Sequence, residues 1–129
     1  MTITTIRTRA KPREIEDAEQ MALMSWLERQ YPAVFARTIH VPNGGHRSKR
    51  VAGRMKAMGT KRGVPDILSF VPSRGKAGLA IEMKRPGAPP SATSNDQRVW
   101  LRHLEGLGWH ACVCRGFEEA KTAFEGYLA

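Results

Sequence analysis

The sequence predicts one mixed α/β domain in which a small β-sheet is flanked by helices. Segments with apolar residues at helical spacing alternate along the chain with short runs rich in β-branched and aromatic residues. The length of 129 residues suffices for one domain with its own core. A hydrophobic fraction of 41% and a charged fraction of 26% argue against extended disorder. We therefore expect a folded domain over residues 14–129, preceded by a flexible basic arm over residues 1–13.

The expected elements alternate between the two kinds of secondary structure. In chain order they are a helix over 14–30, a strand over 34–41, a helix over 47–58, strands over 66–71 and 79–84, a helix over 95–107, a strand over 109–114 and a helix over 117–128.

The first helix is predicted from one apolar stripe. The stripe contains Ile15, Ala18, Ala22, Leu23, Trp26 and Leu27. The helix ends at Tyr31 because a residue before proline disfavours helical geometry. The strand over 34–41 follows from its β-branched and aromatic content, and residues 42–45 (Pro-Asn-Gly-Gly) form a turn. The next helix is basic and only loosely amphipathic, and it stops at Gly59.

The middle of the chain predicts a β-hairpin. The two strands, 66–71 and 79–84, are separated by a short connector rich in turn-forming residues. Strands joined by a short loop pair in antiparallel fashion. After the hairpin, residues 86–90 (Pro-Gly-Ala-Pro-Pro) exclude regular structure.

The C-terminal part begins with a capped helix. Ser94 is a typical N-cap residue, and Gln97 three positions later completes a capping-box pattern. Gly108 marks the end of this helix. A short apolar strand and a final helix complete the chain.

The charge is concentrated in the first half of the chain. The net charge is +9, of which residues 1–65 (13 basic, 5 acidic) contribute +8 and residues 66–129 (8 basic, 7 acidic) +1. No acid lies between Glu28 and Asp66. A block of one sign favours binding to nucleic-acid phosphates, although a solvated basic face would look the same. The residues that we expect to contact nucleic acid are Arg47, Lys49, Arg50, Arg54, Lys56, Lys61 and Arg62.

Asp66, Glu82 and Lys84 form the most informative pattern. Glu82 and Lys84 lie two apart on a strand and therefore share one face, while Met83 points to the opposite face. Asp66 opens the neighbouring strand of the hairpin, so its carboxylate is expected beside Glu82. Two adjacent carboxylates repel unless a proton or a cation lies between them. Mg²⁺ accepts such oxygen ligands, and Lys84 would hold a water or stabilise charge on a phosphate.

A structural interpretation of the same residues is a surface Glu–Lys pair with an unrelated turn aspartate. Glu16 and Gln20 lie one turn apart at the edge of the apolar stripe of the first helix, where Glu16 is in reach of the sheet. Glu19 is the alternative, because it falls nearer the middle of the stripe. Each of these glutamates would also serve as an ordinary acid near a helix N-terminus. Gln97 is expected either to face the site or to act only as a cap.

This pattern resembles the VRR-NUC domain (virus-type replication-repair nuclease), a branch of the PD-(D/E)xK nucleases, over residues 14–128. The matching residues are Glu16 and Gln20; Pro42, Asn43, Gly44, Gly45 and Arg47; Gly63, Val64, Pro65 and Asp66; Gly78, Leu79, Ile81, Glu82 and Lys84; Gln97 and Trp100; and Leu104 and Gly108. Met83 stands where leucine is commoner in the family.

The resemblance implies a restriction-endonuclease-like core that hydrolyses phosphodiesters. It implies that Asp66 and Glu82 hold Mg²⁺ or Mn²⁺, that Glu16 completes the site, and that Lys84 assists the attacking water with Gln97 close by. We also include Met83 among the expected metal-binding residues. Members consisting of this domain alone resemble bacterial or phage homodimers that cut branched DNA, including Holliday (four-way) junctions.

The sequence thus predicts a Mg²⁺-dependent, structure-selective DNA endonuclease without strict sequence specificity. Three alternatives remain: a non-catalytic nucleic-acid-binding module, a sequence-specific restriction-like nuclease, and an accessory subunit whose basic segment meets an acidic protein. The chain has no run of 18 apolar residues and no apolar segment in residues 1–13 typical of a secretory signal. With two cysteines, too few for a disulfide scaffold, we expect a cytoplasmic protein of a bacterial or phage-infected cell with no membrane partner.

Overall fold

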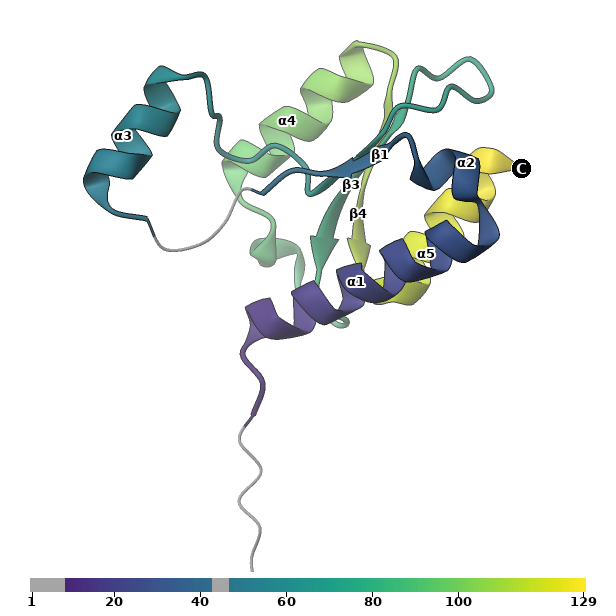
Figure 1. Ribbon diagram of the computed structural model, residues 1–129, viewed down its shortest axis with the longest axis horizontal. Coiled ribbons are helices and arrows are strands. Elements are labelled where there is room, and N and C mark those ends of the chain that lie inside the picture. Colours follow the sequence, from purple (N-terminus) through teal and green to yellow (C-terminus); the bar gives the residue numbers. More distant parts are fainter. Residues whose placement is uncertain (1–8, 43–46) are drawn as a thin grey trace, which may run out of the picture.

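The computed structural model describes residues 9–42 and 47–129, which form a small sheet with helices packed on both of its faces (Figure 1). The elements are α1 (Pro12–Gln30), α2 (Pro32–Phe35), β1 (Thr38–His40), α3 (Lys49–Ala57), β2 (Ile67–Ser69), β3 (Leu79–Lys84), the 3₁₀ turn η1 (Pro90–Ala92), α4 (Asn95–Gly106), β4 (His110–Arg115) and α5 (Gly116–Leu128).

The sheet is mixed and follows the order β1-β2-β3-β4. β2 pairs with β1 and β3 in antiparallel fashion, which confirms the predicted hairpin, and Ile67 lies opposite Ile81. β4 pairs in parallel with β3, and α4 provides the crossover that parallel strands require. This order places the C-terminal end of β3 directly beside the start of β2.

The helices form two layers around the sheet. α1 and α5 pack together against one face, whereas α4 packs against β3 and β4 on the other side (Figure 1). The core between α1, α5 and the sheet includes the fully buried Leu23, Leu27, Ile81 and Phe124. Burial of each such side chain contributes about 1.5–3 kcal/mol. Since Ile81 and Met83 face this core, the alternating Glu82 and Lys84 face the opposite side, towards α4.

The first helix begins earlier than the sequence analysis predicted. Pro12 occupies its first turn, where the missing amide proton of proline costs nothing, and the Lys11 amide donates to Glu14 Oε2 at 3.1 Å. Residues 12 and 13 therefore belong to the helix rather than to a flexible arm. Of that predicted arm, residues 1–8 lie outside the described residues.

The predicted strand over 34–41 is wrong in its first half. Pro32–Phe35 form the short helix α2, and only Thr38–His40 pair with β2. Pro32 suits a helix start, and Thr38 Oγ1 donates to the carbonyl oxygen of Val34 at 2.7 Å. The half-buried Val34 and Phe35 pack against the core from this helix, so tertiary contacts outweigh their β-propensity.

The remaining elements agree with the predicted ones to within a few residues. Ser94 caps α4, and its Oγ accepts from the Gln97 amide at 3.2 Å as the capping-box pattern predicted. α3 stands away from the sheet (Figure 1) and contains no buried residue. None of the helices in the described ranges is long and apolar enough to cross a membrane.

Candidate active site

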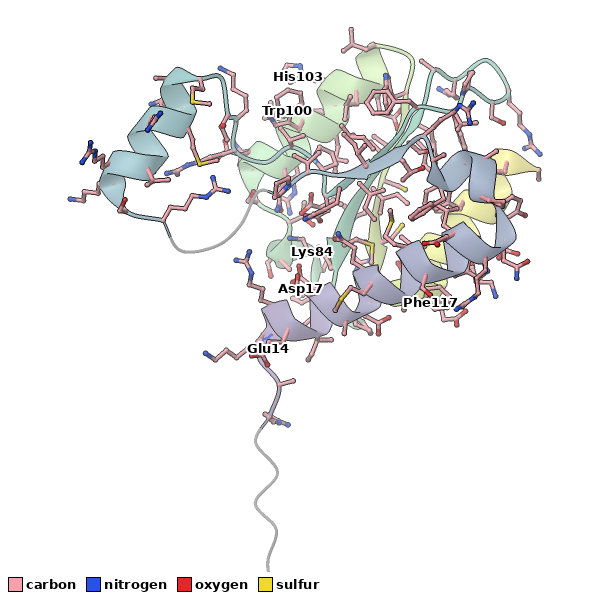
Figure 2. The ribbon with its side chains drawn as sticks, viewed as in Figure 1. Glu14, Asp17, Lys84, Trp100, His103 and Phe117 are labelled. Atoms are coloured by element: carbon pink, nitrogen blue, oxygen red, sulfur yellow. The ribbon has the colours of Figure 1, made fainter. Side chains whose placement is uncertain are left out.

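A cleft of ≈ 820 Å³ opens where the end of β3 meets α1, β1 and the start of α4. Figure 2 shows Lys84 and Asp17 approaching this region from β3 and α1. The polar and charged residues that line the cleft are Arg13, Glu16, Asp17, Gln20, His40, Arg62, Asp66, Glu82, Lys84, Ser94, Asp96 and Gln97. The cleft therefore collects acids and bases from five separate segments of the chain.

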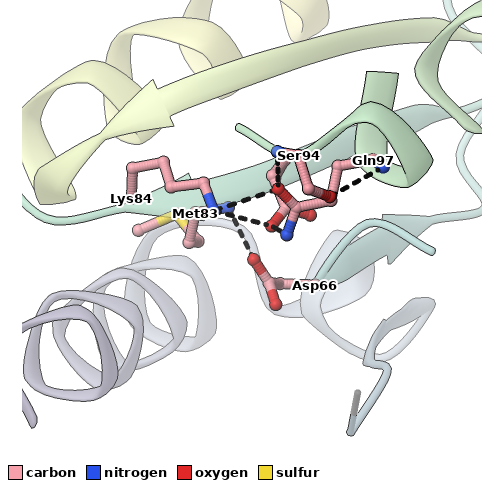
Figure 3. Close-up of polar contacts among 6 residues, drawn as sticks. Asp66, Met83, Lys84, Ser94 and Gln97 are labelled. Atoms are coloured by element: carbon pink, nitrogen blue, oxygen red, sulfur yellow. Dashed lines mark hydrogen bonds and ion pairs between the residues drawn. The ribbon is translucent and has the colours of Figure 1, made fainter. Parts of the chain in front are cut away.

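Asp66 is held at the cleft by the loop before β2. Gly63 adopts a φ of +84°, and a Cβ there would lie 2.5 Å from the backbone carbon of Asp96, so the loop packs against the start of α4 as only glycine allows. Asp66 Oδ2 accepts a hydrogen bond of 2.7 Å from the Met83 amide (Figure 3). Burial raises the pKa of Asp66, and the Met83 amide acts in the opposite direction.

Glu82 lies beside Asp66 and is almost fully buried, with 3% of its surface exposed. Its Oε1 accepts from Gln97 Nε2 at 2.7 Å and lies 3.5 Å from Lys84 Nζ. Its Oε2 is buried and has no hydrogen-bond partner among the described residues. Burial raises the pKa of Glu82 to about 8, and the adjacent Asp66 adds to this rise. The two carboxylates therefore destabilise each other when both are charged.

Lys84 and Gln97 are fixed by a network whose orientation is unambiguous (Figure 3). Gln97 Oε1 accepts from the Ser94 backbone amide at 2.8 Å and from Lys84 Nζ at 3.1 Å. Because both of these groups only donate, the Gln97 oxygen must face them and its Nε2 must face Glu82. The helix cap thereby sets the position of the Lys84 ammonium, whose side chain is 10% exposed.

The two helix-1 glutamates have different surroundings. Glu16 lines the cleft, and burial raises its pKa. The charge of Lys84 lowers this pKa and the charge of Asp66 raises it, so Glu16 lies within electrostatic range of both residues. Glu19 does not line the cleft, and its Oε2 accepts from the Phe117 amide at 2.8 Å at the start of α5. The structure therefore places Glu16, and not Glu19, in the cleft that contains Asp66 and Glu82, although these three carboxylates do not form a metal-binding group in the described chain.

Gln20 connects α1 to the sheet at the same cleft. His40 Nδ1 lies 2.8 Å from Gln20 Nε2 and 3.0 Å from the Asp66 carbonyl oxygen. This contact joins the helix that contains Glu16 to the strand end that contains Asp66.

The donor set fits a hard divalent cation. The unpartnered Glu82 Oε2 and the neighbouring Asp66 carboxylate are two anionic oxygen donors in a poorly solvated place. In the part of the chain that the structure describes, no group of three or more acidic, histidine or cysteine side chains forms a complete metal site. Mg²⁺ usually retains several waters, so two carboxylates are a sufficient protein contribution. The Met83 side chain packs in the core, so it is not available as a metal ligand. Only the backbone carbonyl oxygen of Met83 could serve the predicted metal-binding role.

The predicted nucleic-acid-binding residues are divided between the cleft and α3. Arg62 lines the cleft. The cations on α3 are exposed, and none forms an ion pair with a described residue. Arg47 Nη2 donates to the Pro42 carbonyl oxygen at 3.2 Å. Residues 43–46, which include most of the predicted Pro-Asn-Gly-Gly turn, lie outside the described ranges.

Four charged or polar residues of the cleft were not predicted from the sequence. Arg13 was assigned to the arm, His40 carried no ligand spacing, and Asp17 and Asp96 were not considered. One signal was available for Arg13, because it lies three residues before Glu16 and thus on the same helix face. Nothing in the local pattern signalled His40, because its place depends on the pairing of β1 with β2.

Comparisons with known proteins agree with this architecture. The profile of the VRR-NUC domain matches residues 14–118. A solved structure described as "VRR_NUC domain protein" is similar to this chain with a TM-score of 0.77 and 26% sequence identity, and the alignment covers 88% of each chain. No curated protein matches the chain.

The fold and the carboxylate–lysine cleft, taken with these matches, define a nuclease-type α/β domain. The chain belongs to the VRR-NUC domain family. The family resemblance predicted from the sequence motifs is confirmed.

Proposed function

We propose that this protein is a divalent-metal-dependent DNA endonuclease that hydrolyses phosphodiesters in branched DNA and acts as a homodimer. The observation that carries the proposal is the pairing of Asp66 with Glu82, whose buried Oε2 has no partner in the described chain, beside a fixed lysine. An unsatisfied buried carboxylate oxygen costs free energy, so its position at a cleft favours a cation site over a purely structural pair. A bound cation would remove that cost.

Asp66 and Glu82 would hold Mg²⁺ or Mn²⁺, which would supply Lewis-acid activation of a phosphate oxygen. Lys84 Nζ is held by Gln97 Oε1 and Glu82 Oε1. Because an ammonium has three N–H donors, its third N–H is available to a water or to a phosphate oxygen. Held in this way, Lys84 orients the attacking water and stabilises the negative charge that grows on the phosphate. Glu16 at the rim of the cleft adds negative charge on the α1 side.

The DNA contacts in this proposal are contacts to the backbone. The cations of α3, together with Lys61 and Arg62, lead from the exposed helix to the cleft and would grip phosphates. Contacts to phosphates read the shape of DNA rather than its sequence. A two-fold dimer would present two equivalent clefts to a four-way junction of near two-fold symmetry.

The proposal is tested with purified protein, a labelled four-way junction and a linear duplex of the same sequence. We expect cleavage of the junction in Mg²⁺, no cleavage in EDTA, and little cleavage of the duplex. Asp66→Asn should abolish cleavage while DNA binding in EDTA persists. Glu125→Gln, on the exposed face of α5 and outside the cleft, is the matched control and should cut normally.

The other outcomes identify the alternatives. Salt-sensitive binding without metal-dependent cleavage would identify a non-catalytic DNA-binding module. Cleavage of the linear duplex at defined sequences would identify a restriction-like enzyme. Sedimentation of the free protein as a monomer at assay concentrations would contradict the homodimer.

A further inference from the structure

α3 is a helix that packs extensively against no other helix or strand of the described chain. It contains no buried residue, and it stands apart from the sheet and the other helices (Figure 1). Ser48 caps it, and its Oγ accepts from the Val51 amide at 3.2 Å. A helix of this length is marginal on its own in water, so its sequence is expected to reflect what it contacts.

The residues of α3 are segregated by charge. At 3.6 residues per turn, the exposed Val51 and Met58 share one side with Met55. The cations Lys49, Arg50, Arg54 and Lys56 occupy the rest of the circumference. In a segment that lacks acids altogether, this basic side selects a polyanion.

Gly53 lies at the centre of the basic side. Lys49, Arg50 and Lys56 are four residues before, three before and three after it, which are the positions that surround a residue on a helix surface. A Cβ at Gly53 would meet nothing within 4 Å, and its φ lies outside the range that favours glycine. Neither packing nor backbone geometry therefore requires glycine here, although glycine in a helix interior costs about 0.5–1 kcal/mol relative to alanine.

We propose that Gly53 and its three flanking cations form a seat for one backbone phosphate of the bound DNA. Without a Cβ, the helix backbone approaches the sugar–phosphate chain closely, and Lys49, Arg50 and Lys56 surround the phosphate from both sides. The inference rests on the proposed function, because it names where the DNA substrate of that site is held. The occupant is nucleic acid, since the cations would repel the same helix of a second copy.

The test compares wild-type protein with Gly53→Ala and Gly53→Leu by fluorescence anisotropy on a four-way junction in EDTA, over a series of salt concentrations. Alanine and leucine have similar helix propensities, so the pair differs mainly in size. We expect the leucine variant to bind about five- to tenfold more weakly than the wild type at ~0.1 M salt, which is the counterion-release value of one phosphate contact. Its plot of log K against log salt should be shallower by about 0.9.

Gly126→Ala and Gly126→Leu provide the matched control. Gly126 is also an exposed helical glycine with nothing within 4 Å of an added Cβ, but it lies in α5. This pair should not differ in DNA affinity. Circular dichroism of the four variants establishes that each is folded.

Equal affinities and equal salt slopes for the wild type and the two Gly53 variants would overturn the seat. A loss of affinity in Gly53→Leu that is accompanied by a change in sedimentation, with the salt slope unchanged, would also overturn it, because α3 would then contact a second copy. If the Gly53 variants change DNA binding as expected but the wild-type protein never cuts in Mg²⁺, the proposed nuclease activity fails while the phosphate seat stands.

Discussion

Lys84 is buried in a place where a lysine needs compensation. Its side chain is 10% exposed, and its ammonium has Glu82 Oε1 at 3.5 Å and Gln97 Oε1 at 3.1 Å as partners. A buried ion pair contributes little net stability, because desolvation offsets the attraction between the charges. The presence of the pair at a cleft therefore argues for a chemical rather than a structural role.

Lys84→Met tests this role, because methionine has a similar shape without the charge. We expect cleavage to fall by about 10²–10³-fold, the magnitude typical of losing one electrostatic stabiliser, with DNA affinity in EDTA nearly unchanged. Single-turnover cleavage and anisotropy measure the two effects. Lys76→Met, in the exposed β2–β3 connector, is the control. A parallel loss of binding and cleavage would show that Lys84 acts in DNA binding instead.

Ser94 and Gln97 separate the two roles of the helix cap. Ser94→Ala removes the hydroxyl that accepts from the Gln97 amide, but it keeps the Ser94 amide that orients Gln97 Oε1. We expect a loss of about 1 kcal/mol in the free energy of unfolding and unchanged cleavage. Gln97→Ala removes the partner of both Glu82 and Lys84, so cleavage should fall by about 10–100-fold. Equal cleavage by Gln97→Ala and wild type would show that Gln97 is only a cap.

At the scale of elements, local patterns predicted what local interactions determine. The β2–β3 hairpin and the α4 cap were predicted because a short connector and a capping box are encoded within a few residues. The helix α2 was missed because its stability comes from packing of Val34 and Phe35 on a core that no local pattern describes. The same reasoning explains why the sequence left Glu16 and Glu19 as alternatives. Their surroundings depend on how α1 lies against α5.

The Gly63 loop connects the basic segment to Asp66, and its geometry predicts a large effect of one methyl group. Gly63→Ala would strain a φ of +84° and push a Cβ to within 2.5 Å of the α4 backbone. We expect a loss of about 2–4 kcal/mol in the free energy of unfolding. Gly87→Ala has a similar φ of +74° but open space, so it should cost only about 1–2 kcal/mol. Denaturant unfolding of both variants measures the difference, and equal losses would contradict the close packing.

Substitutions of Glu16 and Glu19 in α1 test which of these two glutamates belongs to the cleft. Glu19→Gln weakens the bond to the Phe117 amide at the start of α5, so stability should fall by about 1 kcal/mol and cleavage should be retained. Glu16→Gln removes charge from the cleft, so the Mg²⁺ concentration needed for half-maximal cleavage should rise by about tenfold with little change in stability. Cleavage at a series of Mg²⁺ concentrations tests both. The opposite assignment, with Glu19→Gln changing the Mg²⁺ dependence, would show that the helix-1 role belongs to Glu19.

At the scale of the whole molecule, the fold brings together charges that the sequence keeps apart. The basic excess lies in the first half of the chain, whereas Glu82, Lys84 and Gln97 lie in the second half. Sheet pairing places Asp66 beside Glu82, and the crossover helix α4 delivers Gln97 to the same point. Spacing along strands predicted the shared face of Glu82 and Lys84. The contributions of Arg13 and His40 to the cleft arise only from packing between distant segments.

The collected carboxylates couple the binding of protons to the stability of the whole fold, and the proposed function adds divalent cations to this coupling. The pKa of Glu82 is raised to about 8 in the folded protein from an ordinary value of 4.5, and that of Asp66 is also raised. The folded state thus binds more protons than the unfolded state over this range, so stability without metal is lost as pH rises from about 4.5 to about 8. A divalent cation bound as proposed would replace the proton and oppose the loss.

Thermal unfolding in EDTA should therefore show a Tm that falls as pH rises from ~5 to ~8. The fall should correspond to a loss of a few kcal/mol in the free energy of unfolding. Mg²⁺ should restore much of the loss at the upper end and change little at the lower end, where protons occupy the carboxylates. Glu82→Gln has no charge to desolvate, so it should flatten the fall in EDTA and weaken the response to Mg²⁺. Glu125→Gln, an exposed glutamate, should behave like the wild type. If Glu82→Gln and wild type lose stability equally over this range, the buried carboxylate pair does not control the pH dependence. The groups that titrate must then lie elsewhere.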